Sequence, residues 1–177
     1  LDALCDEIAA MPWVNSVSAR RSWPDRILLR VNERRIAARW GDKHAIGADG
    51  ISFDPGGVTL PDALPRLHGP EGAEKLLLEG LVEMGDIVAH AGYVIQALWI
   101  DERGAWHVDL KDDQGALVSL HMGRTDIDNR MKRFMGPVRK ALGKRISDAA
   151  YVDLRYGNGF AVRWRDPEGQ ASDQKSG

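Results

Sequence analysis

The sequence has few of the features that identify a protein class directly. It has a single cysteine, Cys5, which excludes an internal disulfide and a metal site built on several cysteines. No apolar run approaches the ~20 residues that span a bilayer, and no signal peptide is visible. Neither sign of charge dominates, because 24 Lys and Arg residues face 26 Asp and Glu residues. The net charge of -2 argues against a general affinity of the whole chain for nucleic acid.

The remaining composition is that of a folded protein. Hydrophobic residues make up 44% of the 177 residues and charged residues 28%, which is enough for a packed core in one large domain or two small ones. One local basic stretch lies between residues 130 and 145. We interpret it as the solvated face of an amphipathic helix, in preference to a nucleic-acid site. Its members are Arg130, Lys132, Arg133, Arg139, Lys140, Lys144 and Arg145.

The first forty residues predict a small α+β unit. Apolar residues at helical spacing indicate a helix over residues 2–10, which ends before Pro12. Strands over residues 13–20 and 27–31 follow, with a turn at residues 22–25 between them. Trp23 lies in that turn beside Pro24, and we interpret it as a structural residue.

The pattern from residue 40 onward is dominated by strands. The pair Asp49-Gly50 predicts a tight hairpin whose φ angles are positive at the turn. Thr125 is the expected N-cap of the last helix, and Pro137 should bend that helix. The predicted elements are a hairpin over 45–53, a loop over 54–72, a helix over 71–91, strands over 93–100, 106–110 and 116–122, a helix over 125–142, a hairpin over 151–164 and a frayed tail from 166.

No motif in the sequence predicts catalysis. The five histidines are scattered without metal-ligand spacing, and neither a nucleophile elbow nor a phosphate-binding glycine loop is present. Two acidic pairs, Asp112 with Asp113 and Asp126 with Asp128, lie where turns and first helical turns favour acids for local reasons. We therefore expect no catalytic residue, no metal and no cofactor, although catalytic residues can also assemble from distant positions.

Several short segments follow one another in a specific order along the chain. They are Pro12-Trp13-Val14, Arg20-Arg21-x-Trp23-Pro24-Asp25, Glu33-Arg34, Ala37-Ala38-Arg39-Trp40, Asp49-Gly50-x-x-Phe53, Leu64-Pro65-x-Leu67-x-Gly69-Pro70-Glu71-Gly72, Arg103-Gly104-Ala105-Trp106-His107-Val108-Asp109-Leu110, Leu120-x-Met122-Gly123-Arg124, Arg133-Phe134, Val152-Asp153-Leu154-Arg155-Tyr156 and Asn158-Gly159-Phe160-Ala161-Val162-Arg163-Trp164. In this order they resemble the FtsQ/DivIB family of bacterial cell-division proteins. The chain departs from the family pattern in two ways: Ile36 stands where the family usually has proline, and the opening strand and first helix of the family's POTRA domain are missing.

The resemblance implies an α+β fold with the C-terminal part of a POTRA domain over residues 1–41. It implies a β domain flanked by two helices over 42–165, and a disordered tail over 166–177. It also implies a non-enzymatic scaffold in septal cell division, whose partners are FtsB and FtsL. In the family, one transmembrane helix precedes these domains, so the implied location is the inner membrane with these residues in the periplasm.

The last strand, Phe160 to Trp164, has no following element to pair with, so we expect it at a sheet edge. An edge strand offers free N–H and C=O groups that an extended partner segment can complete. By analogy with the family, the FtsB-like segment is met by Arg103, Arg155, Tyr156, Asn158, Gly159, Phe160, Val162 and Trp164. In this assignment the two arginines meet acids, Tyr156 is an aromatic anchor and Trp164 flanks the partner.

Other interpretations remain open for these residues and for the chain. Tyr156 and Trp164 could belong to the core of the last hairpin, and Arg155 and Arg163 could decorate its solvent face. As a whole, the chain could be a POTRA-containing accessory protein of outer-membrane assembly or secretion, or an unrecognised periplasmic hydrolase. A hydrolase should show a deep pocket with convergent titratable groups, whereas a scaffold should show an open sheet edge beside an arginine and an aromatic residue.

Overall fold

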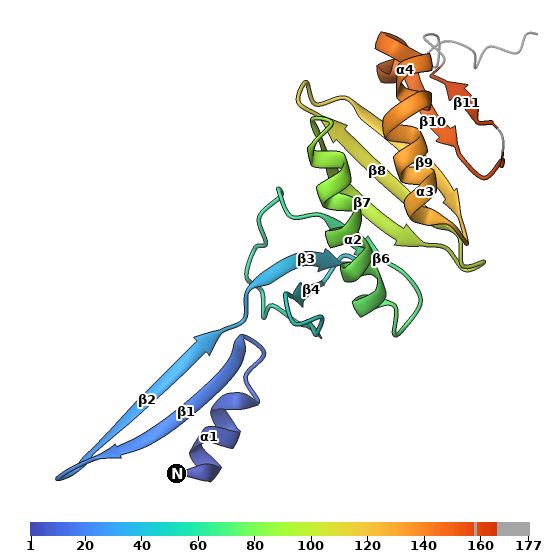
Figure 1. The fold of residues 1–177 in the computed structure, drawn as a ribbon. Helices are drawn as coiled ribbons and strands as arrows, with labels where there is room; N and C mark the ends of the chain where they lie inside the picture. Colours follow the sequence, from blue (N-terminus) through green and yellow to red (C-terminus); the bar gives the residue numbers. More distant parts are fainter. Residues whose placement is uncertain (158, 166–177) are drawn as a thin grey trace, which may run out of the picture. The chain divides into compact units, whose positions relative to one another are not determined.

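The computed structural model describes residues 1–157 and 159–165, and the chain divides into two compact units after residue 79. Asn158 and the predicted tail over 166–177 lie outside the described residues. Each unit combines helix with β-sheet, which confirms the α+β prediction (Figure 1). Within the part that is described, no helix combines the length and the apolar character needed to cross a membrane.

The first unit begins with the predicted helix and strand pair. Helix α1, Asp2–Ala9, precedes strand β1, Val14–Ser22, and strand β2, Arg26–Glu33. The two strands form an antiparallel ribbon in which Val17 lies opposite Val31. Trp23, in the turn of this ribbon, is 87% exposed, so it does not belong to the core. The residues on either side of it in the turn are exposed as well.

A second sheet completes the first unit. Its order is β6-β3-β4-β5, with β3 at Ile36–Trp40, β4 at His44–Gly47, β5 at Ser52–Phe53 and β6 at Arg66–His68. Strand β3 pairs antiparallel with β4 and parallel with β6. Strand β6 lies within residues 54–72, which the sequence predicts as a loop. The strand was not predicted because it is only three residues long, and three residues show no periodicity.

The hairpin between β4 and β5 is found where the Asp-Gly pair predicts it, but its turn differs. Gly50 has a φ of 80°, whereas Asp49 stays at negative φ. Asp49 instead accepts a hydrogen bond from the backbone N–H of Ile51 through Oδ1, at 3.1 Å. A side chain that accepts from the backbone two residues later is a common way to close a turn.

Helix α2, Glu74–Ala89, leads into the second unit, and Gly92 follows it with a φ of 79°. The sheet of the second unit has the order β11-β10-β9-β8-β7. The neighbours pair antiparallel except β9 and β10, which run parallel. The strands are β7, Tyr93–Ile100; β8, Trp106–Asp112; β9, Leu117–Gly123; β10, Ala149–Asp153; and β11, Ala161–Trp164.

A helical crossover joins the parallel strands β9 and β10. It consists of α3, Ile127–Arg133, a π-helical turn, Phe134–Val138, α4, Arg139–Leu142, and a 3₁₀ segment, Gly143–Asp148. The N-cap is Asp126, with a φ of 61°, so the assignment of Thr125 as the cap is wrong. Pro137 lies inside the π turn, where its missing N–H and its ring disturb α-helical bonding as predicted.

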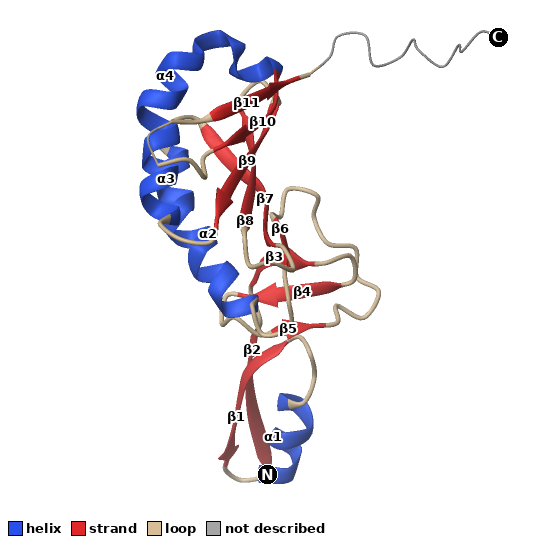
Figure 2. Cartoon of the chain, turned by 90° about the vertical axis from the view of Figure 1, so that its right-hand side faces the viewer, coloured by secondary structure: helices blue, strands red, loops and turns tan. Residues whose placement is uncertain are grey.

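The core of the second unit lies between its sheet and these helices. Figure 2 shows α3 and α4 along one face of the β7–β11 sheet. Alternate residues of each strand point toward that face, as the two-residue period of a strand requires. The buried residues of the strands and the crossover include Leu98, Val108, Leu110, Leu120, Met122, Met131, Phe134, Val138 and Val152.

Two glycines of α2 allow a matched test of how α2 packs on Trp106 of β8. A Cβ on Gly80 would lie 2.7 Å from the Trp106 ring, whereas a Cβ on Gly85 would meet nothing within 4 Å. We expect Gly80→Ala to destabilise the protein by roughly 1–3 kcal/mol, because the ring must move. Gly85→Ala should stabilise it by up to about 1 kcal/mol through helix propensity. Urea denaturation of both variants measures the difference, and equal effects would contradict the packing of Trp106 on α2.

Candidate functional site

The last strand of the second unit lies at the edge of its sheet. Strand β11 ends the order of the sheet, as the sequence predicts, and it pairs with β10 along one side. Among residues 1–157 and 159–165, no strand pairs with its other side. Its free N–H and C=O groups are therefore available to an added strand.

One side of this edge is apolar. Val162 lies opposite the buried Val152, so the even-numbered residues of β11 point to the helix side of the sheet. Val162 and Trp164 are half-buried there, and Phe160, directly before β11, is half-buried as well. The guanidinium of Arg145, in the 3₁₀ segment, lies 4.2 Å from the centre of the Trp164 ring, which places a cation on its face. A strand added to this edge would cover the half-buried row.

The strand register brings Arg103 and Arg155 to the same end of the sheet. Arg103 lies in the turn after β7, and the end of β7 pairs with Trp106, the start of β8. Trp106 in turn lies opposite Gly123, the last residue of β9. Since β10 runs parallel to β9, the residues that follow β10 also emerge at this end. Both arginines are exposed.

Arg155 is fixed by a buried carboxylate. Asp153, 5% exposed, accepts from the Nη2 of Arg155 at 2.6 Å and from its Nε at 2.9 and 3.0 Å. The side chain of Arg155 itself is 59% exposed. This arginine therefore presents its remaining donors to solvent in a fixed orientation. The hydrogen bonds from Arg155 are the main reason that the pKa of Asp153 lies below its ordinary value.

Arg133 fixes the backbone that carries Tyr156. From α3 it donates to the carbonyl oxygens of Leu154 and Gly157 at 2.6 Å and of Tyr156 at 2.9 Å. The segment after β10 is thus held by a side chain rather than by regular secondary structure. Arg133 belongs to the basic stretch that the sequence assigns to a solvated helix face, and its spacing gives no signal that separates it from the other basic residues nearby.

A neighbouring arginine of the same helix also points inward. Arg130 donates through Nη1 to the carbonyl oxygen of Met122, at the end of β9. Gly123 follows with a φ of 76°, and a Cβ at this residue would lie 3.2 Å from Cγ of Arg155 and against Nη1 of Arg130. A side chain at position 123 would displace both arginines. Part of the predicted basic face therefore supports the end of the sheet.

The turn that carries Arg103 is held by Asp101. Its Oδ1 accepts from the backbone N–H groups of Arg103 and Ala105, each at 2.9 Å, and its Oδ2 lies 3.1 Å from Nε2 of His107. The bond from Ala105, followed by that from His107, lowers the pKa of Asp101. The position of Arg103 is therefore set by a closed turn.

A row of rings crosses the sheet on the face opposite the helices. Trp99 stacks on His107 at 5.0 Å, His107 meets His121 edge-on at 4.9 Å, and His121 stacks on Tyr151 at 4.4 Å. Burial lowers the pKa of His121, and the neighbouring His107 adds to the effect. Within the described part of the chain, no group of His, Cys, Asp and Glu is arranged to hold a metal ion. The row thus ties four strands together.

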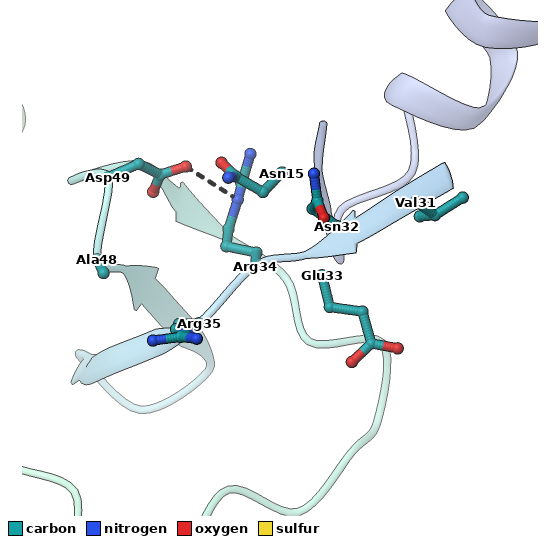
Figure 3. Close-up of a pocket in the computed structure, with 8 residues that line it drawn as sticks. All are labelled: Asn15, Val31, Asn32, Glu33, Arg34, Arg35, Ala48 and Asp49. Carbon is teal, nitrogen blue, oxygen red and sulfur yellow. Dashed lines mark ion pairs between the residues drawn. The ribbon is translucent and has the colours of Figure 1, made fainter. Parts of the chain in front are cut away.

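The first unit contains a polar hollow of a different kind (Figure 3). Arg34, 12% exposed, lies with Nε 3.2 Å from Oδ2 of Asp49, and its guanidinium lies 5.2 Å from the centre of the Phe53 ring. Trp13 meets Phe53 edge-on at 5.3 Å and donates through Nε1 to the carbonyl oxygen of Pro55 at 3.2 Å. These contacts join the β1–β2 ribbon to the β4–β5 hairpin, and the charge of Arg34 is already paired.

The remaining predicted residues lie along the loop and the edge strand. Tyr156 is 57% exposed, which excludes its alternative assignment to the core, whereas Trp164 is half-buried. Gly159 is exposed, and Asn158 lies outside the described residues. Arg155 lies at the surface, but its guanidinium forms an ion pair with Asp153, so it is not simply a solvated surface residue. The residues that sequence reasoning missed here are the supports Asp153 and Arg133.

We expect Asp153→Asn to destabilise the protein by about 1–2 kcal/mol at neutral pH, because the ionised carboxylate bonds Arg155. Arg155 lowers the pKa of Asp153 in the folded state, so the stabilisation is fully present above the ordinary value of 3.8. It is lost as the pH falls through the lower, folded value. Urea denaturation of both proteins at neutral and acidic pH should show this gap narrowing. A gap that is independent of pH would contradict the assignment.

We also expect Arg133→Gln to cost about 1–3 kcal/mol of unfolding free energy, because one guanidinium serves three carbonyl oxygens. Lys132→Gln, at the exposed neighbouring position, should stay within about 0.5 kcal/mol of the original protein. Amide hydrogen exchange should accelerate around residues 154–157 in the first variant alone. Unchanged exchange there would show that Arg133 does not hold the loop.

Comparison with known proteins gives two family matches in chain order. Residues 1–34 match the POTRA domain of FtsQ type, and residues 38–155 match the C-terminal part of cell division protein FtsQ/DivIB. Cell division protein FtsQ of Coxiella burnetii is 33% identical over 164 residues, which are 93% of this chain and 66% of that protein. The same-named protein of Escherichia coli is 37% identical over 161 residues, 87% of this chain and 56% of that protein.

The chain thus spans between about half and two thirds of the length of these relatives. The FtsQ of a Thioalkalivibrio species, 33% identical over 166 residues, extends the same likeness to 94% of this chain and 68% of that protein. Together with the two family matches, these likenesses cover both described units. This chain belongs to the FtsQ/DivIB family of cell division proteins.

Proposed function

We propose that this chain is a non-enzymatic scaffold of the divisome that recruits FtsB and FtsL through the open edge of β11. The observation that carries the proposal is the position of β11 at the end of its sheet, beside an exposed arginine and an exposed tyrosine. Family membership supports a role in cell division. The choice of FtsB as the segment that adds to the edge rests on the family resemblance.

Strand addition accounts for both affinity and selectivity. The backbone of β11 offers hydrogen bonds to any extended segment, whatever its sequence. The half-buried Val162 and Trp164 lie on the helix side of this edge, so an added strand with apolar residues on that side would exclude water from them. Alternate residues of the partner would then face the helix side, as the pleat requires.

Two arginines would contribute charge selectivity at the end of the sheet where β11 begins. Asp153 accepts from the Nε and Nη2 groups of Arg155, and among residues 1–157 and 159–165 nothing accepts from Nη1, so this group can meet a carboxylate of the partner. Arg103, in the turn closed by Asp101, emerges at the same end of the sheet. The side chain of Arg155, held by Asp153, loses less conformational entropy on binding than a mobile one, whereas at Arg103 only the backbone is held. The two arginines therefore favour an acidic segment over a neutral one.

Tyr156 is the aromatic anchor in this proposal. Its side chain is 57% exposed while its backbone is held by Arg133, so the ring can be buried by a partner without rearrangement of the loop. Tyrosine and arginine dominate the energetics of many interfaces because they bury large surfaces with few rotatable bonds. Gly159, with Asn158, would set the turn that leaves the edge open.

The same proposal covers the location and the domain organisation. The chain would lie in the periplasm, anchored to the inner membrane by a helix outside these residues. Residues 1–41 would form the C-terminal part of a POTRA domain and residues 42–165 the β domain. Strand β3 lies before residue 42 in the chain, but it pairs with β4 and β6, which lie after it. Catalysis would play no part, and the partners would be proteins.

Titration calorimetry with a peptide from the periplasmic end of FtsB tests this function. We expect binding to the 177-residue chain, and a loss of about 2 kcal/mol, or roughly 30-fold in affinity, for Tyr156→Ala. Arg155→Glu should weaken binding as well, because it reverses the charge that meets the acid. Lys111→Glu, an equal charge change at an exposed position of β8, is the matched control and should bind normally.

Two N-methylated versions of the peptide separate strand addition from other modes. Methylation of alternate backbone nitrogens removes the donors of one edge while leaving every side chain in place. Only the peptide methylated on the edge that faces β11 should lose binding. Equal affinity of the two peptides, or normal binding by Tyr156→Ala with native circular dichroism, would refute the proposal.

A further inference from the structure

A cluster of arginines lies on one face of the β1–β2 ribbon, far from the site at β11 in the sequence. In the antiparallel register, Arg20 lies opposite Leu28, Ser22 opposite Arg26, and Ser18 opposite Arg30. Residues that lie opposite each other point to the same face, and so do residues two apart along a strand. Arg20, Arg26 and Arg30 therefore share one face and surround Leu28.

This face carries positive charge without compensation. All three arginines are exposed, and within the described part of the chain none of them takes part in an ion pair. Diagonal neighbours in a strand pair lie about 7–8 Å apart, close enough for like charges to repel. Over residues 20–30 four arginines stand against Asp25 alone, a net charge of +3 in a chain whose total is -2: Arg20, Arg21, Arg26 and Arg30.

An exposed tryptophan stands at the end of the same ribbon. Trp23 is 87% exposed, the largest fraction among the exposed large hydrophobic residues, and the turn that holds it is the end of the ribbon away from β3 (Figure 1). Leu28, within the arginine face, is 51% exposed. We define the ribbon tip as Trp23 with Arg20, Arg26, Leu28 and Arg30. An apolar ring that projects beyond a group of cations is a combination found at membrane interfaces, where the ring lies at headgroup level.

We propose that the ribbon tip docks on the surface of an anionic phospholipid bilayer. The three arginines would lie against phosphate and acidic headgroups, and the Trp23 ring would insert at the level of the headgroups. The repulsion among the arginines is offset when they lie against negative charge. This proposal is independent of strand addition at β11, because it uses other residues in the other unit of the chain.

A lipid surface fits these observations better than an acidic protein segment. The charge lies on the face of a ribbon that also exposes Leu28, and an insertable aromatic ring stands at its end. A peptide ligand would need a partner for the ring, whereas a bilayer receives the cations and the ring together. Phosphate alone would engage the arginines and leave Trp23 unchanged. These differences define the experiment.

Vesicle flotation with the 177-residue chain tests the proposal. We expect the chain to float with vesicles of phosphatidylcholine and phosphatidylglycerol and to remain unbound with phosphatidylcholine alone. Each arginine near an anionic surface contributes about fivefold to partitioning, so Arg20→Glu with Arg30→Glu should reduce it by well over tenfold. Lys43→Glu with Lys111→Glu changes the net charge equally at exposed positions elsewhere and should partition almost as the unchanged chain does.

Fluorescence tells insertion from simple charge attraction. Brominated phospholipids should quench the tryptophan emission of the bound chain, and Trp23→Phe should bind but lose most of that quenching. Trp23→Ala should bind more weakly. Binding that is equal for both vesicle types, or equal for the two double variants, would overturn the proposal. So would a chain that fails to float but binds an acidic peptide through the same arginines.

Discussion

The parallel pairing of β10 with β9 is the constraint on which the candidate site depends. Parallel neighbours need a long crossover, and here residues 124–148 provide it with α3, the π turn, α4 and a 3₁₀ segment. The crossover returns the chain to the start of β10 and covers one face of the sheet (Figure 2). The following hairpin then adds β11 outside β10. With an antiparallel β10, the residues that follow it would emerge at the opposite end of the sheet from Arg103.

The same crossover supplies the side chains that hold the site together. Arg133 reaches three carbonyl oxygens of the segment after β10, and Arg130 reaches the end of β9. A guanidinium carries five donors in a rigid plane, which lets one side chain replace a missing strand or helix as the hydrogen-bond partner of a loop. At Asp153 the roles differ, because there a buried carboxylate orients the exposed arginine Arg155. The exposed residues of the site are thus presented by residues that are not themselves available to a partner.

Much of the candidate site could be predicted from the sequence because it consists of local patterns. The last hairpin, its position at the edge and the closed turn around Arg103 follow from the period of the apolar residues and from turn chemistry. The supports could not be predicted in this way. Arg133 and Arg130 sit among other basic residues, and spacing alone assigns all of them to a solvated face. Strand β6 was missed for a similar reason, since three residues pair there only because β3 passes beside them. The cap at Asp126 in place of Thr125 depends on a backbone angle that the sequence does not specify.

The fold class, the order of most helices and strands, and the family could be read from the sequence alone, because periodicity and short motifs can be recognised without knowledge of contacts. The exposure of Trp23 and the sharing of one face by Arg20, Arg26 and Arg30 were decided by the ribbon register, which a sequence specifies only through its neighbours. The tertiary structure alone also decided which arginines are free and which are bound. A sequence does not show which arginines are paired, because the role of each depends on the carbonyl and carboxylate oxygens that the fold places around it.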